Sequence, residues 1–209
     1  MTRIVVFGAG GRAGRAVLAE AAARDWDVTA VVRDPSRHAG LGRVSLVAGD
    51  VTSPDAVASL SEGHDAAVHA AATLAVPAAE FFPAAASSLL TGLAAARVPR
   101  LVAVGLASQL PDVTGVPLID TPGYPSEHRD FMLGHGAGLS VFRRASTPVD
   151  WLVVAPAGDF DHGGAPTGGY RFVPGAASAL ITYADLAVAV ADEIARPRHH
   201  RLLVGVAAG

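Results

Sequence analysis

The chain has 209 residues and a net charge of −3. It contains no cysteine, and it contains no lysine because all 16 of its Lys and Arg positions are arginine. Disulfides, thiolate nucleophiles and cysteine metal sites are therefore excluded, and so are lysine Schiff bases and the lysine of a phosphate-binding P-loop. No block of basic residues occurs, and Pro, Gly or charged residues interrupt every long apolar stretch, so we expect no nucleic-acid partner and no membrane association. We expect one cytoplasmic domain over residues 1–209, either a monomer or a weak homodimer.

Short apolar runs alternate with alanine-rich amphipathic stretches along the whole chain. The runs predict strands over residues 3–7, 28–32, 44–48, 66–69, 101–104, 151–154 and 202–206. The amphipathic stretches predict helices over residues 12–24, 54–60, 77–97, 127–144 and 183–195. Near-continuous apolar strands are typical of parallel sheets covered on both faces. The alternation therefore predicts an α/β fold of the Rossmann type, with a doubly wound, mostly parallel sheet in three αβα layers.

Two long irregular stretches, near residues 105–126 and 155–179, are rich in Pro, Gly and Asp. Each follows a late strand, so both should lie at the carboxyl edge of the sheet, where open α/β folds bind ligands. Loops this long in a compact domain are usually functional. We expect them to form the substrate side of a site.

A glycine-rich turn, Gly8-Ala9-Gly10-Gly11-Arg12-Ala13-Gly14, joins the first expected strand to the first expected helix. In such turns the first glycine allows the tight bend, the second lets backbone amides approach a pyrophosphate, and the third lets the helix pack on the sheet. The phosphates then lie at the positive end of that helix. The turn predicts dinucleotide binding by Gly8, Gly10, Gly11, Arg12, Ala13 and Gly14.

Arg33 ends the second expected strand, where the 2′ position of the adenosine ribose is recognised. An acid there favours NAD, whereas an arginine accommodates a 2′-phosphate and favours NADP. Arg12 could supply a second positive charge, and Arg37 is a weaker candidate. We expect NADP(H) to be preferred over NAD(H).

Further motifs follow in a characteristic order: Arg33-Asp34-Pro35, Gly49-Asp50-Val51-Thr52-Ser53-Pro54-Asp55, Asp150-Trp151 leading to Ala155-Pro156, and Ile181-Thr182-Tyr183-Ala184-Asp185. With the glycine turn, they resemble the atypical short-chain dehydrogenase/reductases. The most similar subgroup is the NAD(P)H-binding one, described as NADH-flavin reductase-like or NmrA-like. The resemblance covers nearly the whole chain and is thinnest between residues 105 and 126.

The resemblance implies further cofactor contacts at the ends of the later strands. Asp50 and Val51 would flank the adenine, and Ala70, Ala71 and Ala72 would line the adenine ribose and the pyrophosphate. Ala107 and Ser108 would lie near the nicotinamide ribose, and Pro156 and Ala157 near the nicotinamide carboxamide.

The wider superfamily uses a Tyr-x-x-x-Lys pair, in which the lysine lowers the pKa of the tyrosine. This chain has no lysine, so that pair is missing. Tyr124 and His128 keep the spacing, but Pro125 favours extended geometry at Tyr124, so the two side chains need not share a helix face. The sequence favours a loop position for Tyr124 over a catalytic one.

Other proton donors are Ser108, which could instead bond its own loop, and two histidines, His128 and His135. The histidines lie seven residues apart, so both could face one side of a helix, although a surface or capping role is the plainer interpretation. Asp159, Asp161 and His162 have metal-ligating side chains, but no second cluster lies nearby and we expect no metal. His199 and His200 are expected in a solvated turn.

We therefore expect an NADPH-dependent oxidoreductase that passes hydride to a planar conjugated acceptor such as a flavin, a quinone or a polyketide-like molecule. Such acceptors need little acid catalysis, which fits the absence of lysine. Aromatic side chains could form an apolar roof over the acceptor: Phe81, Phe82, Tyr124, Phe131, Phe160, Tyr170 and Phe172. The alternatives are a non-catalytic NADP(H)-binding redox sensor that acts through a protein partner, and an epimerase- or isomerase-like enzyme.

Overall fold

A computed structural model describes residues 1–38, 40–42 and 44–209. The central sheet contains β1 (Arg3–Phe7), β2 (Asp27–Val32), β3 (Ser45–Ala48), β4 (Ala66–His69), β5 (Arg100–Val104), β6 (Asp150–Pro156), β8 (Tyr170–Phe172) and β10 (Leu202–Ala208). The helices are α1 (Arg12–Ala23), α2 (Pro54–Ser61), α3 (Ala78–Ala95), α4 (Arg129–Arg144) and α5 (Tyr183–Ala195). Each predicted strand and helix is present, within a few residues of its predicted bounds.

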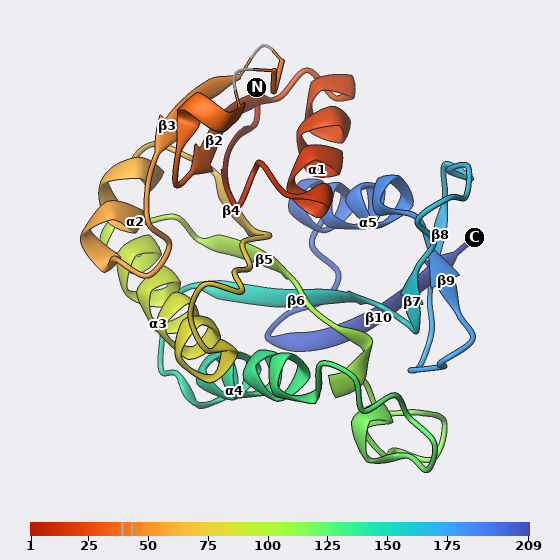
Figure 1. The fold of residues 1–209 in the computed structure, drawn as a ribbon. Helices are drawn as coiled ribbons and strands as arrows, with labels where there is room; N and C mark the ends of the chain where they lie inside the picture. The colour runs from red at the N-terminus through yellow and green to blue at the C-terminus, as the bar shows by residue number, and fades with distance from the viewer. Residues whose placement is uncertain (39, 43) are drawn as a thin grey trace.

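The strands follow the order β3-β2-β1-β4-β5-β6-β10-β8 (Figure 1). All neighbouring pairs are parallel except β10 and β8, which run antiparallel at one edge. The order reverses direction between β1 and β4, so the loops that leave these two strands diverge and open a crevice at the carboxyl edge. The structure confirms the predicted Rossmann-type fold.

Helices cover both faces of the sheet, which gives the three predicted layers (Figure 1). One apolar cluster joins the sheet to α2, α3 and α4, and a second joins its other face to α1 and α5. Helix α3 is long and apolar enough to cross a membrane by length and composition alone, but 50% of it is buried inside the protein. It packs as a core helix between α2 and α4.

Helix α4 begins two residues later than predicted. His128 precedes it with φ of 60°, a left-handed conformation that ends the preceding turn and starts the helix at Arg129. Tyr124 therefore lies outside the helix, as Pro125 predicted.

The segment between β6 and α5 contains more structure than the predicted irregular stretch. It forms β8 and a small two-stranded sheet of β7 (Asp159–Phe160) and β9 (Leu180–Ile181). The buried carboxylate of Asp185 accepts hydrogen bonds from the backbone N–H groups of Thr167, at 3.0 Å, and Gly168, at 2.8 Å. This aspartate fastens the segment to the start of α5.

His200 is exposed, as expected for a solvated turn, whereas His199 is half-buried, and both belong to a polar network at the amino edge of the sheet. His199 Nδ1 lies 2.7 Å from Oε1 of the fully buried Glu193. His200 Nδ1 lies 2.8 Å from Oδ2 of Asp150. Arg100 joins the two carboxylates, at 2.7 Å to Asp150 and 3.2 Å to Glu193. The network lies at the sheet edge opposite the crevice.

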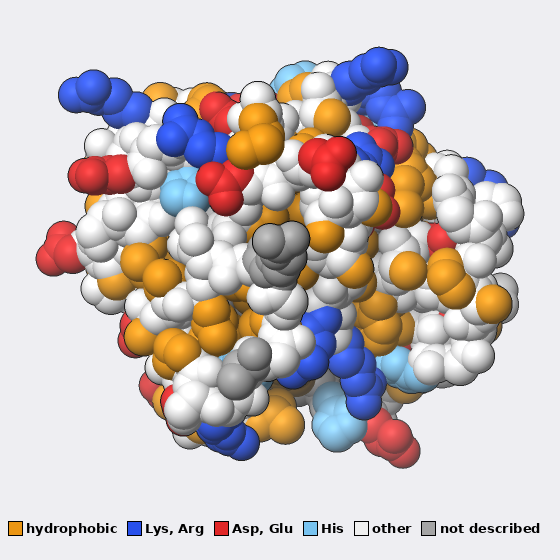
Figure 2. All heavy atoms as spheres, turned by 90° about the horizontal axis from the view of Figure 1, so that it is seen from above, with side chains coloured by type: hydrophobic (Ala, Val, Ile, Leu, Met, Phe, Trp, Pro, Cys, Tyr) orange, Lys and Arg blue, Asp and Glu red, His pale blue; other side chains and the backbone are white. Residues whose placement is uncertain are grey.

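The surface seen from above shows basic and acidic side chains interspersed with hydrophobic ones among the residues drawn in colour (Figure 2). Every blue side chain in that view is an arginine, since the chain has no lysine.

Candidate functional site

A cavity of about 250 Å³ lies at the crevice between β1 and β4. It is lined by the glycine turn, the ends of β2 and β3, and the segment after β4. Nine of the predicted cofactor residues meet here: Gly8, Gly10, Gly11, Arg33, Asp50, Val51, Ala70, Ala71 and Ala72. The structure thus gathers the residues predicted for the adenosine and pyrophosphate into one cavity.

The three spaced glycines of the turn are Gly8, Gly11 and Gly14, and a side chain would have a different effect at each position. Gly8 has φ of +85°, and a Cβ there would overlap the backbone of Ala71. A Cβ on Gly14 would lie 2.8 Å from Cα of Ala9, so this glycine allows α1 to pack on the turn. Gly11 is different, because the nearest atom to a Cβ there would be the Gly8 carbonyl oxygen at 3.5 Å. The fold tolerates a methyl group at Gly11, so the space beside it is available to a ligand.

Helix α1 starts directly at this space. Gly11 is its N-cap and makes no side-chain capping bond, and the first turn contains no acidic residue. The N-terminal N–H groups and the helix dipole therefore favour an anion beside Gly11. The residues present fit a dinucleotide pyrophosphate.

The adenosine end of the cavity contains one carboxylate and one arginine. Oδ1 of Asp50 accepts hydrogen bonds from Thr52 N at 2.9 Å and Thr52 Oγ1 at 2.7 Å, which fixes the carboxylate and leaves Oδ2 for a ligand. Arg33 is exposed at the end of β2.

A residue that the sequence reasoning missed, His38, also lines this cavity. It ends the short 3-10 helix η1 (Pro35–His38), which begins after Asp34. Oδ1 of Asp34 accepts hydrogen bonds from Ser36 N at 3.0 Å and Ser36 Oγ at 2.6 Å. The Asp-Pro-Ser pattern after β2 is a signal for such a turn and could have indicated that His38 returns toward the glycine turn.

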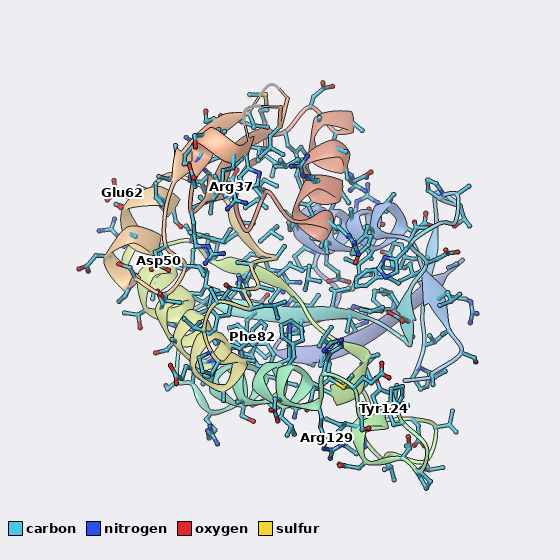
Figure 3. All side chains as sticks on the ribbon, in the orientation of Figure 1. Arg37, Asp50, Glu62, Phe82, Tyr124 and Arg129 are labelled. Atoms are coloured by element: carbon cyan, nitrogen blue, oxygen red, sulfur yellow. The ribbon has the colours of Figure 1, made fainter. Side chains whose placement is uncertain are left out.

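A second cavity of about 250 Å³ lies farther along the carboxyl edge, after β5 and β6. Ser108, Tyr124 and His128 line it together, beside Ala107 and Pro156. The structure thus brings together three of the four predicted proton donors. Figure 3 shows Asp50 and Tyr124 on opposite sides of the molecule, so the two cavities form the two ends of one edge.

Ser108 and Tyr124 are suited to donating hydrogen bonds. The Ser108 hydroxyl is buried, at 1% exposure, and has no hydrogen-bond partner within the described residues. Burial, and then the nearby charge of Asp159, raises the pKa of Tyr124. Tyr124 therefore remains a neutral phenol, which can donate a hydrogen bond but cannot act as a base near neutral pH.

His135 does not reach this second cavity. Its ring packs against Phe82, with ring centroids 3.7 Å apart, and against Phe131, at 5.0 Å. It shares a small pocket of about 30 Å³ with His69, at the end of β4. Burial, and then the neighbouring His69, lowers the pKa of His135 to about 3. His135 is therefore neutral near pH 7 and lies apart from the cavity that brings the other three candidate donors together.

The burial of His69 leads to a prediction about how the free energy of unfolding changes at acid pH. Burial lowers its pKa to about 4, whereas an unfolded histidine titrates near 6.5. The unfolded chain therefore binds more protons below pH 6.5, so stability is fully present above that pH and is lost as the pH falls toward 4. Between pH 7.5 and pH 5, His69 should account for a loss of about 2 kcal/mol in the free energy of unfolding.

Urea unfolding of the wild type and of His69→Leu at both pH values measures this loss. The stability difference between the two proteins should shift by that amount between the two pH values. Equal differences at pH 7.5 and pH 5 would contradict a buried neutral His69.

The remaining predicted cofactor residues lie outside the linings of both cavities. Arg12 extends from the start of α1, with Nη1 3.4 Å from His162 Nδ1 of the segment after β7. Ala13 and Gly14 lie within α1. Ala157 is buried, and its N–H and C=O are bonded to Val206 O and Ala176 N. Direct cofactor contacts by these four residues stay predictions.

The predicted aromatic roof is only partly assembled. Tyr124 and Phe160 line the second cavity, but Phe81 lines the cofactor cavity, and Phe82 packs against Phe131 between α3 and α4. Tyr170 donates a hydrogen bond to Asp192 of α5 at 3.0 Å, and Phe172 packs on His199. Among the described residues, no group of three or more His, Asp or Glu side chains is arranged to hold a metal ion.

Comparison with known proteins gives a consistent result. The sequence model of the NAD(P)H-binding family matches residues 8–197. The uncharacterised protein YwnB of Bacillus subtilis (strain 168) is 32% identical over 206 residues, which cover 94% of each protein. A proposed exported protein from Burkholderia pseudomallei has a similar structure, with a TM-score of 0.85 at 30% identity over 99% of this chain and 100% of that one.

Two further solved structures carry functional descriptions. A proposed NADH-flavin reductase from Streptococcus pneumoniae TIGR4 has a TM-score of 0.83 at 25% identity and covers 100% of both chains. A proposed epimerase from Bacteroides thetaiotaomicron has a TM-score of 0.82 at 27% identity, over 99% of this chain and 97% of that one. The chain therefore belongs to the NAD(P)H-binding family, which is consistent with the predicted resemblance to the atypical short-chain dehydrogenase/reductases.

Proposed function

We propose that this protein is an NADPH-dependent oxidoreductase that reduces a planar conjugated acceptor, such as a flavin, a quinone or a polyketide-like molecule, without a Tyr/Lys pair. One observation carries the proposal. The buried hydroxyl of Ser108, which has no hydrogen-bond partner in the described part of the chain, lies in a cavity with Tyr124 and His128, on the same sheet edge as the cofactor cavity. A buried hydroxyl without a partner is costly unless a ligand supplies one.

The walls of the second cavity suit a flat molecule. Tyr124 and Phe160 contribute flat aromatic rings. Pro125, Pro156 and Met132 contribute apolar surface beside them. Binding of the cofactor pyrophosphate at the glycine turn would hold the cofactor so that its nicotinamide, which supplies hydride, faces this cavity.

The protein's own residues would then orient the acceptor and donate a hydrogen bond to it. Ser108 and the neutral phenol of Tyr124 can each donate to an acceptor oxygen or nitrogen, and His128 can complete a proton transfer from solvent. Orientation would be the main catalytic contribution, because a conjugated acceptor takes up hydride readily.

The direct test is NADPH oxidation in the presence of a panel of flavins, quinones and simple ketones. We expect turnover with the conjugated acceptors and about tenfold lower kcat/KM for Ser108→Ala, which removes one donor. Ser88→Ala is the matched control, because Ser88 also has a buried hydroxyl with no partner among the described residues but lies in α3, outside the cavity. Turnover only with simple ketones would overturn the proposed substrate class.

Two other results would point to the alternatives. Tight NADP(H) binding with no turnover of any acceptor would favour a redox sensor that acts through a protein partner. Interconversion of epimers without net NADPH consumption would favour an epimerase-like enzyme, the description given to the Bacteroides relative.

The NADP(H) preference depends on Arg33 and has its own prediction. Its exposed guanidinium lines the cofactor cavity and can form a charge-assisted pair with a 2′-phosphate. In Arg33→Ala we expect NADPH affinity to fall about tenfold while NADH affinity changes little. Fluorescence titration of both cofactors measures this, and an unchanged ratio of the two dissociation constants would refute the role of Arg33.

A further inference from the structure

His38 occupies an unusual position above the glycine turn. A Cβ built on Gly10 would lie 2.7 Å from Nε2 and 2.8 Å from Nδ1 of His38, so the imidazole rests on the backbone of Gly10. Gly10 is not one of the three spaced glycines, and its φ is outside the left-handed region. A side chain at position 10 would therefore have to displace the His38 ring.

The two ring nitrogens of His38 have different surroundings. Nδ1 is buried and has no hydrogen-bond partner within the described residues. A buried N–H without an acceptor is costly, so the proton of the neutral ring is favoured on Nε2. Nε2 is then the donor that a ligand in the cavity can use.

Charged side chains of both signs lie around the ring. Among the described residues that line this cavity, the charged or titratable side chains are Arg33, His38 and Asp50. Oδ1 of Asp34 accepts hydrogen bonds from Ser36. The pKa of Asp34 is lowered mainly by the Ser36 hydrogen bond and, to a smaller extent, by the charge of the nearby Arg37. Arg37 lies on the same side of the molecule as Asp50, the side of β2 and β3 (Figure 3).

We infer that His38 is a specificity-determining residue, whose Nε2 donates a hydrogen bond to the 2′-phosphate from the side of the cavity facing Gly10, in the cavity that Arg33 also lines. This inference rests on the proposed preference for NADP(H). In this inference Gly10 makes room for the His38 ring, and the pyrophosphate binds at Gly11 and the start of α1.

The test is calorimetric titration with two adenosine fragments, 2′,5′-ADP and 5′-ADP, which differ in the 2′-phosphate. The wild type should bind 2′,5′-ADP more tightly. His38→Phe keeps a flat ring over Gly10 but removes the donor, so it should lower 2′,5′-ADP affinity about tenfold and leave 5′-ADP affinity unchanged. His200→Phe makes the same chemical change at the opposite edge of the sheet and should alter neither affinity.

Each other outcome has a distinct meaning. If His38→Phe retains the preference for 2′,5′-ADP, the inference about His38 fails while Arg33 can still select NADP(H). If the variant lowers the affinities for both fragments equally, the ring contacts the adenine, and the proposed hydrogen bond from His38 to the 2′-phosphate is refuted. If the wild type binds both fragments equally, the preference for NADP(H) itself fails, and hydride transfer from NADH remains open to the activity assay.

A second pair of variants tests the role of Gly10. Gly10→Ala should displace the imidazole and reduce 2′,5′-ADP affinity as His38→Ala does. The double variant Gly10→Ala/His38→Ala should bind both fragments as His38→Ala does, because the added methyl then has nothing to displace. Loss of 5′-ADP binding in the double variant would show that Gly10 itself contacts the cofactor and would overturn the assignment.

Discussion

Gly11→Ala is expected to leave the fold intact and to weaken NADPH binding by at least about tenfold, or ~1.4 kcal/mol. Gly11 has φ of −76° and ψ of 172°, which alanine adopts readily, and the methyl group would contact the protein only at ordinary distances. The methyl would, however, occupy the space in which a pyrophosphate approaches the first N–H groups of α1. Fluorescence titration with NADPH and urea unfolding measure the two effects separately.

Two other glycines serve as controls for this prediction. Gly14→Ala should destabilise the fold, because its methyl would meet the carbonyl of Gly8 and Cα of Ala9. Gly169→Ala should change neither stability nor binding, since no atom lies within 4 Å of a Cβ there. If Gly11→Ala bound NADPH like the wild type, the pyrophosphate would not lie at the start of α1.

Arg100→Met is expected to cost about 3 kcal/mol of unfolding free energy, the lower end for removing one partner of a buried pair. Arg100 is 5% exposed, and its Nη2 lies 3.2 Å from Oε2 of the fully buried Glu193. The substitution therefore leaves a buried carboxylate without its arginine. For a domain of this size the melting temperature should fall by roughly 10 °C. Cofactor affinity should stay unchanged, because the network lies at the opposite sheet edge.

Arg129→Met is the matched control, since this arginine is 46% exposed and lies 4.0 Å from Asp120. It should cost less than about 1 kcal/mol. The double variant Arg100→Met/Glu193→Leu should recover part of the stability lost in Arg100→Met, because the buried carboxylate that has lost its arginine is then also removed. A loss in Arg100→Met no larger than that in Arg129→Met would show that Glu193 does not depend on Arg100.

The cofactor side of the site was predictable because its signal is local. Strand, glycine turn, helix and second strand occupy the first 33 residues, and parallel strands place their carboxyl ends at one edge. Any residue directly after a strand, such as Asp50 or Ala71, must therefore lie near that edge. Residues 105–126 and 155–179 gave no such periodic signal, so β7 and β8 could not be predicted, nor could the hydrogen bonds by which Thr167 and Gly168 reach Asp185.

The sequence by itself determined the fold class, the dinucleotide turn and the absence of lysine chemistry, because each depends on composition or on contacts between near neighbours. Only the tertiary structure decided which of the candidate histidines face a cavity. His128 and His135 share a helix spacing, yet one lines the second cavity and the other packs on Phe82. His38 reaches Gly10 across 28 positions of the chain, and Arg100 joins Glu193 across 93. Such contacts are set by how helices and loops pack on the sheet, and no periodicity in the sequence encodes that packing.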